Sequence, residues 1–161
     1  MDEHTLPQDE LRDLYRELIL DHARNPRHFG KLDNVSHEAE GINPLCGDKL
    51  KLYFRIGENE VIEDAKFEGS GCAISVASAS LLTDTVIGLT TSQALDYFSA
   101  INALLATDNG DQSVNRPQVD LSKLRALQGV REFPSRVKCA TLAWHGLNSA
   151  IHKQKKTVST E

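Results

Sequence analysis

Three cysteines and one aspartate are the residues of this chain whose types and positions suit chemistry. Cys46 lies two residues before Asp48 in the segment Asn-Pro-Leu-Cys-Gly-Asp, and Cys72 directly follows Gly-Ser-Gly. Cys139 lies five residues after Pro134, where a helix is expected to begin. Backbone N–H groups and the positive dipole at a helix N-terminus stabilise a thiolate, the form of cysteine that binds metals and attacks electrophiles. Three thiolates and one carboxylate would complete a four-coordinate zinc site.

The spacing of the cysteines leaves two interpretations open. They lie 26 and 67 residues apart, without the short spacing of a C-x-x-C pair. A free cysteine is commonly a small buried apolar residue, so three unrelated buried thiols are as consistent with this spacing as one shared site. The positions beside glycines, in a loop and at helix starts, favour the shared site.

Length and composition indicate a single domain over residues 1–161. The chain has a net charge of -5 and 40% apolar residues, and a domain of this length can build a core without disulfides. Three cysteines are an odd number and too few for a secreted disulfide scaffold, so a cytoplasmic protein is expected. The acidic N-terminus does not resemble a signal sequence, and no apolar run is long enough for a membrane span, so neither secretion nor a membrane is expected. The basic residues are scattered along the chain, which argues against nucleic acid as a partner.

Hydrophobic periodicity predicts the elements that must position the cysteines. Apolar and polar residues alternate over residues 49–56 and 61–67, which predicts a β-hairpin. Residues 25–43 show only weak periodicity of their apolar residues. Helical spacing predicts helices over 8–22, from Cys72 to Gly88, from Thr90 to Leu105, around Leu121 to Leu127, and over 134–151. A polar loop is expected near 107–120 and a frayed basic tail from about residue 153. This order predicts an α+β fold in which helices cover one face of a small antiparallel sheet.

Several motifs together resemble the NifU N-terminal/IscU-like family, and within it the SufU branch. They occur in family order and cover nearly the whole chain: Asp21-His22 with Asn25-Pro26-Arg27, Asn43-Pro44-Leu45-Cys46-Gly47-Asp48, Phe67 to Ser75 with Ala77 to Ser80, and Arg136 to Leu142 with Trp144. The resemblance implies an α+β scaffold fold and a metal site built from Cys46, Asp48, Cys72 and Cys139.

Two departures from the general scaffold pattern match the SufU branch. Lys138 stands where IscU-type scaffolds have a histidine, and a long segment, about 107–132, precedes Cys139. The SufU branch is associated with zinc and with accepting persulfide sulfur from a cysteine desulfurase. The resemblance therefore implies a zinc-dependent sulfurtransferase that serves iron–sulfur cluster biogenesis, with a SufS-like desulfurase and downstream assembly proteins as partners.

The same residues also fit two other functions: a scaffold on which a [2Fe-2S] cluster is built, and a structural zinc module that only recruits partners. For the sulfurtransferase, Cys46 is the expected sulfur acceptor because its loop should move more easily than the helix-anchored Cys72 and Cys139. The resemblance also places Arg136 near the metal as a functional residue, although an ordinary solvated arginine is the alternative.

Three further residues receive structural interpretations. His22 and His28 are expected at a helix end or in a partner contact, since four better metal ligands are available. Trp144 lies on the apolar stripe of the last predicted helix and is expected in the core.

Overall fold

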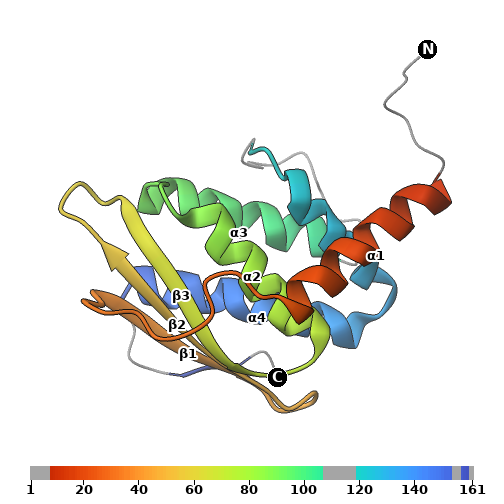
Figure 1. Cartoon of the computed structure of the whole chain (residues 1–161), viewed down its shortest axis with the longest axis horizontal. Coiled ribbons are helices and arrows are strands. Elements are labelled where there is room, and N and C mark those ends of the chain that lie inside the picture. The colour runs from red at the N-terminus through yellow and green to blue at the C-terminus, as the bar shows by residue number, and fades with distance from the viewer. Residues whose placement is uncertain (1–7, 107–118, 154–156, 160–161) are drawn as a thin grey trace.

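Helices form one layer against a four-stranded sheet (Figure 1), which confirms the predicted α+β class. The computed structural model describes residues 8–106, 119–153 and 157–159. In chain order the elements are α1 (Gln8–Arg24), β1 (His37–Asn43), β2 (Asp48–Ile56), β3 (Ile62–Ser70), α2 (Ala73–Val86), α3 (Thr91–Leu105), η1 (Ser122–Glu132), α4 (Pro134–Ile151) and β4 (Val158–Ser159). Within the described residues, no helix combines the length and apolar character needed to cross a membrane.

The sheet has the strand order β3-β2-β1-β4. β2 pairs with β3 and with β1 in antiparallel fashion, which confirms the predicted hairpin. β4 pairs with β1 in parallel, whereas the sequence predicted no strand in this part of the tail. Residues 107–118, most of the predicted polar loop, lie outside the described residues.

β1 was missed because its sequence carries little apolar signal. Its inward positions are Ala39, Gly41 and Asn43, which are small or polar, and its one large apolar residue, Ile42, alternates with them. Strand prediction depends on apolar alternation, which this strand supplies only weakly. Its pairing places Asn43 directly opposite Asp48, with a tight turn between them.

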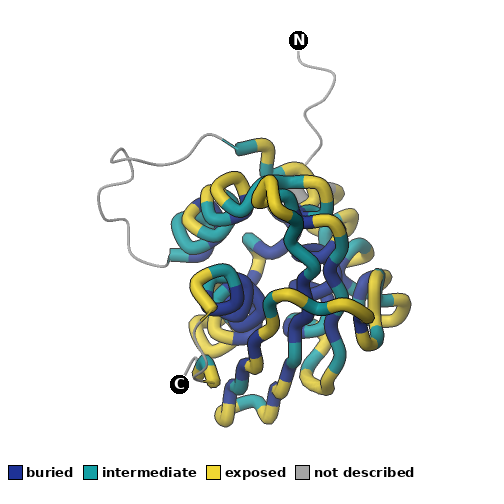
Figure 2. The backbone as a smooth tube through the Cα atoms, turned by 90° about the vertical axis from the view of Figure 1, so that its left-hand side faces the viewer, coloured by how far each residue is buried: buried dark blue, intermediate teal, exposed yellow. Residues whose placement is uncertain are grey.

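The core lies between the sheet and the helices. The inward face of β2 contributes Leu50, Leu52 and Phe54, all fully buried, and α4 packs across β1 and β2. Gly146 of α4 permits a close approach, because a Cβ atom there would lie 2.7 Å from Cδ1 of Leu52. In Figure 2 the buried residues, drawn in dark blue, lie toward the inside of the molecule on both strands and helices.

α2 runs through the middle of the helical layer, packed against α1, α4 and β3. It is buried on most sides, so small residues replace the single apolar stripe that the sequence suggested. Trp144 of α4 is fully buried, as expected, and its Nε1 donates a 3.2 Å hydrogen bond to Ser78 of α2. Ser78 in turn donates to the carbonyl of Ala140 at 2.5 Å, which joins α2 to α4 beside Cys139.

Three predicted helix boundaries are confirmed in detail. Thr90 and Gln93 form a reciprocal capping box at the start of α3, Pro134 is the first residue of α4, and Cys72 is the N-cap residue of α2. The short helix predicted around Leu124 is η1, which has 3-10 geometry. The starts of α2 and α4 matter for the site because each has a cysteine nearby.

Candidate metal centre

The four predicted ligands come from three places that meet at one end of the sheet. Cys46 lies in the turn between β1 and β2, and Asp48 is the first residue of β2. Cys72 caps α2 directly after β3, and Cys139 lies in the second turn of α4. The turn forms because Gly47 adopts a φ of +75°, in the region that glycine reaches without strain, and the N–H groups of Cys46 and Gly47 both donate to the carbonyl of Asn43.

Cys46, Asp48 and Cys139 form a close group of potential ligands. One ligand atom from each residue lies within 4.8 Å of the other two, and the two sulfur atoms are 3.2 Å apart. Two thiolates bound to one tetrahedral zinc at about 2.3 Å would lie about 3.8 Å apart, so a small outward shift is enough to admit the ion. This donor set of two sulfurs and one carboxylate oxygen fits zinc.

Asp48 is held in place by hydrogen bonds from both sides. It is only 2% exposed. Oδ1 accepts a 2.8 Å hydrogen bond from the main-chain N–H of Cys72, and Oδ2 accepts one of 3.3 Å from Nδ2 of Asn43. Gly71 leaves room for this carboxylate, since a Cβ atom there would lie 2.6 Å from Oδ1. Burial with specific donors is how proteins keep a carboxylate in a fixed orientation.

Asn43 is a residue of the centre for which the sequence predicted no role. Its fully buried amide donates to Oδ2 of Asp48 and to Sγ of Cys139, in each case at 3.3 Å. Its Oδ1 has no hydrogen-bond partner among the described residues. Asn43 belongs to the Asn-Pro-Leu-Cys-Gly-Asp motif, but its role follows from the pairing of β1 with β2, which the sequence does not predict.

Cys72 is near this group without being part of it. Its thiol is not among the three ligand atoms that lie within 4.8 Å of one another, although it interacts with both Cys139 and Arg136. The structure therefore brings three of the four predicted ligands together and places the fourth beside them. Ligation by all four remains a prediction.

Burial controls the protonation of Cys139. It raises the pKa of the Cys139 thiol well above its ordinary value, and hydrogen bonds with Cys46, Asp48 and Cys72 raise it further. From the sequence, the N-terminus of the helix is expected to favour a thiolate here. Cys139 lies beyond the first turn of α4, where the dipole effect has faded, so desolvation prevails. A bound cation would reverse this balance and release the proton.

Arg136 lies beside the thiols, three residues before Cys139. Electrostatic attraction to the thiol groups of Cys72, Cys139 and Cys46 in their ionised form raises the pKa of the Arg136 guanidinium, and a hydrogen bond with Cys72 adds to the effect. The residue is exposed, so its charge is accessible from solvent. This position suits the predicted functional role of Arg136. Lys138 of the same helix is also exposed.

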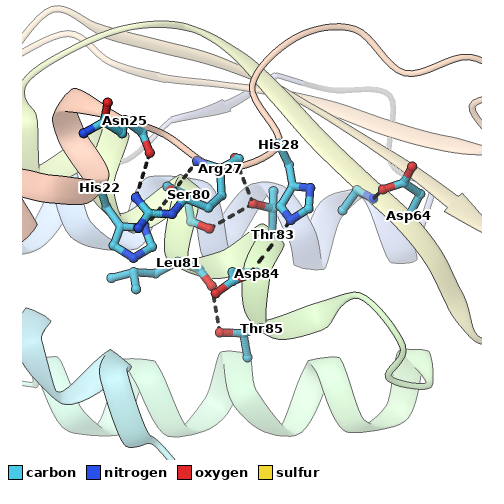
Figure 3. A network of polar contacts seen from close by, with 11 residues as sticks. His22, Asn25, Arg27, His28, Asp64, Ser80, Leu81, Thr83, Asp84 and Thr85 are labelled. Carbon is cyan, nitrogen blue, oxygen red and sulfur yellow. Dashed lines mark hydrogen bonds and ion pairs between the residues drawn. The ribbon is translucent and has the colours of Figure 1, made fainter. Parts of the chain in front are cut away.

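His22 and His28 belong to a polar network away from these ligands (Figure 3). His22 lies in the last turn of α1, and its buried Nδ1 is 2.7 Å from Oγ of Ser80 on α2. The same Ser80 oxygen accepts the N–H of Arg27, whose guanidinium pairs with Asp21 at 2.6 Å. The Asn-Pro-Arg turn therefore anchors α1 to α2 and has a structural role. His28 is exposed and lies 3.9 Å from the carboxylate of Asp84.

Comparisons with known proteins agree on one family. Residues 14–160 match the NifU-like N terminal domain. The chain is 41% identical over 142 residues to "Zinc-dependent sulfurtransferase SufU" of Bacillus subtilis, covering 88% of this chain and 92% of that protein. It is 40% identical over 145 residues to "Iron-sulfur cluster assembly scaffold protein IscU" of Streptococcus pyogenes, covering 89% of this chain and 86% of that protein.

A solved structure has the same fold. The crystal structure of a putative iron–sulfur cluster assembly scaffold protein for the SUF system from Fervidobacterium islandicum superposes with a TM-score of 0.69 at 34% identity. The match covers 84% of this chain and 94% of that one.

Proposed function

Because the chain belongs to the family of NifU-like N-terminal domains, we propose that it is a zinc-dependent sulfurtransferase. In this proposal it accepts persulfide sulfur from a cysteine desulfurase and supplies that sulfur for iron–sulfur cluster assembly in the cytoplasm. The observation that carries the proposal is the close group of Cys46, Asp48 and Cys139, with Cys72 and Arg136 beside it. The similarity to the zinc-dependent sulfurtransferase SufU of Bacillus subtilis supports the same activity.

Cys46 is the proposed acceptor. It is half-buried in a turn, whereas Cys139 is fully buried inside α4 and Cys72 caps α2. The neighbouring Leu45 is 66% exposed, so the turn faces solvent at the point where a donor must approach. A nucleophile needs both access and freedom to move toward the electrophile, and of the three cysteines Cys46 combines them best.

The reaction is a thiol–persulfide exchange. The Cys46 thiolate attacks the outer sulfur of the desulfurase's cysteine persulfide, and a new S–S bond forms between Sγ of Cys46 and that sulfur. The S–S bond of the donor breaks, and its electron pair remains on the desulfurase cysteine, which leaves as a thiolate. The sulfane sulfur keeps its proton or negative charge throughout, so the exchange needs no external oxidant or reductant.

The residues around Cys46 divide the remaining tasks. Zinc, held by Cys46, Asp48, Cys72 and Cys139, would keep the thiols ionised near neutral pH. Asp48 is the weakest soft-metal donor of the four, but its two hydrogen bonds fix its direction. Arg136 places a permanent positive charge next to the thiolates, where it stabilises the negative sulfur during transfer.

A cluster scaffold is the second candidate. The Streptococcus pyogenes relative carries the scaffold name at nearly the same identity, and thiolate sites accept iron–sulfur clusters as well as zinc. The position before Cys139 favours the transferase, because Lys138 is exposed and an ammonium group does not ligate metal. A purely structural zinc module is the third candidate, and it requires no accessible nucleophile.

The decisive experiment combines metal analysis with a coupled desulfurase assay on one anaerobically purified sample. The transferase should contain near-stoichiometric zinc without iron and should accelerate desulfurase turnover. Cys46→Ser should keep the fold and abolish the acceleration, while Lys49→Ala, an exposed change on the same end of β2, should retain it. Iron with labile sulfide would favour the scaffold, and unchanged turnover with the wild-type protein would favour the structural module.

A further inference from the structure

A groove of about 1000 Å³ lies between α1 and η1, beside the candidate metal centre. The two helices pack against each other (Figure 1), and the N-terminal ends of α2 and α4 complete the walls. Cys72 and Arg136 are among the lining residues. The groove is therefore continuous with the site where sulfur would arrive, although neither the metal ligation nor the transfer step accounts for it.

The groove has the opposite charge to the protein as a whole. Four arginines line it, namely Arg12, Arg16, Arg131 and Arg136, against the single acidic residue Glu132, whereas the chain carries a net charge of -5. Arg12 and Glu132 form an exposed ion pair of 3.7 Å between α1 and η1. Among the described residues, Arg16 and Arg131 have no carboxylate partner within ion-pair distance. Uncompensated positive charge of this kind in a concave surface attracts an acidic partner.

The groove also offers apolar contact area. Tyr15 and Ile74 are half-buried in its wall, and Phe133 is 59% exposed at the start of α4. Large exposed aromatic side chains next to arginines are typical of the centre of a protein interface. The occupant that fits both properties is a polypeptide segment that carries acidic and apolar side chains.

We propose that this groove is the docking surface for an acidic segment of the cysteine desulfurase that donates sulfur to Cys46. The inference rests on the proposed function, which supplies the identity of the partner. A persulfide sulfur must come into contact with Cys46, so the donor's neighbouring segments must lie on the surface around the centre. A volume of about 1000 Å³ is at the upper limit of ordinary small-molecule pockets, which also favours a polypeptide.

Charge reversal at the two arginines without carboxylate partners tests this docking. Arg16→Glu on α1 and Arg131→Glu on η1 each place a negative charge in the groove without touching a proposed ligand. Arg125→Glu is the matched control, because Arg125 is exposed on η1 but does not line the groove. Desulfurase turnover is measured against the concentration of each variant, at low and moderate salt, after circular dichroism and zinc content have shown intact folds.

Docking through the groove predicts that Arg16→Glu and Arg131→Glu raise the KM for this protein roughly tenfold, with kcat at saturation retained. It also predicts that the salt dependence of KM is weaker in these variants than in the wild type, and that Arg125→Glu resembles the wild type. The rate of sulfur transfer from a low-mass donor, cysteine persulfide, should be equal in the wild type and the three variants, because this donor needs no docking surface.

Equal KM values for Arg131→Glu, Arg125→Glu and the wild type would overturn the docking surface and leave the transferase intact. A wild-type protein that fails to accelerate the desulfurase at any concentration would instead overturn the proposed function and, with it, this partner. Slower transfer from cysteine persulfide in the groove variants would also contradict docking, because it would show that the arginines act on the chemistry.

Discussion

The main-chain N–H of Cys72 donates a 2.8 Å hydrogen bond to Oδ1 of Asp48, which ties the start of α2 to the start of β2. Asp48 is a proposed metal ligand, and it also accepts the hydrogen bond that fixes the backbone of Cys72, a second proposed ligand. A change at Asp48 should therefore affect metal binding and local folding separately, depending on whether an acceptor oxygen remains.

Asp48→Asn and Asp48→Ala should separate these two effects. Both remove the negative charge, so both should lower zinc affinity at least about tenfold, as measured by competition with a chromophoric chelator. Asp48→Asn keeps an oxygen for the N–H of Cys72, whereas Asp48→Ala does not. The free energy of unfolding of the zinc-free Ala variant should therefore be about 1–3 kcal/mol lower than that of the Asn variant in urea titrations. Equal stability of the two variants would contradict the proposed importance of this hydrogen bond.

Asn43→Ala should weaken metal binding without removing any ligand. The Asn43 amide orients Asp48 and donates to Cys139, and loss of such an outer partner typically lowers metal affinity by about 10–100-fold. The zinc dissociation constant and the thiolate-to-metal absorption of the cobalt-substituted protein should both change. Ser149→Ala is the control, because Ser149 is buried in α4 and its hydroxyl has no partner among the described residues. Zinc affinity that is identical in both variants would show that Asn43 only fills space.

Gly71→Ala should displace the Asp48 carboxylate by direct collision. The new Cβ atom would lie 2.6 Å from Oδ1, which is too close to tolerate. Zinc affinity should fall about tenfold, while the helical circular dichroism signal stays close to that of the wild type. Gly129→Ala on η1 has open space at the corresponding position and should change neither property. Wild-type zinc affinity in Gly71→Ala would contradict the observed packing of Gly71 against Asp48.

Features that depend on neighbouring residues could be predicted from the sequence, whereas features that depend on contacts between separate segments could not. Cys46 and Asp48 share one turn, and Cys72 and Pro134 mark helix starts, so local patterns were enough to locate them. The role of Asn43 depends on its place in β1 and on its contact with Cys139, 96 residues away along the chain. The groove depends on contacts between α1 and η1, which are also far apart in the sequence. β1 carries too little apolar alternation to be recognised, and the groove exists only because η1 packs against α1. The effect of burial on the pKa of Cys139 was also unpredictable, because it depends on how α4 packs against the sheet.

The buried His22 should make the protein less stable in mild acid. Burial lowers the pKa of His22 below its ordinary value of 6.5, with a smaller contribution from the charge of Arg27. Ser80 already accepts the N–H of Arg27, so its own proton is free to be donated to Nδ1 of a neutral His22. Because the folded pKa is depressed, the stabilisation is complete above about pH 6.5 and is lost as the pH falls toward the folded pKa.

Urea unfolding from pH 7.5 to pH 5 checks this expectation. The free energy of unfolding of the wild type should decline with falling pH, and that of His22→Gln should decline less steeply. The difference between the two slopes isolates His22 from the thiols and from the other histidines. Parallel pH profiles would contradict a neutral, buried His22.

Peptide mass spectrometry can identify the cysteine that receives sulfur. The zinc-loaded protein is mixed with a cysteine desulfurase and cysteine for a single turnover, its thiols are alkylated, and each cysteine peptide is analysed. We expect one additional sulfur atom on the peptide that contains Cys46 and none on those containing Cys72 or Cys139. A persulfide on Cys72 or Cys139 in place of Cys46 would contradict this expectation.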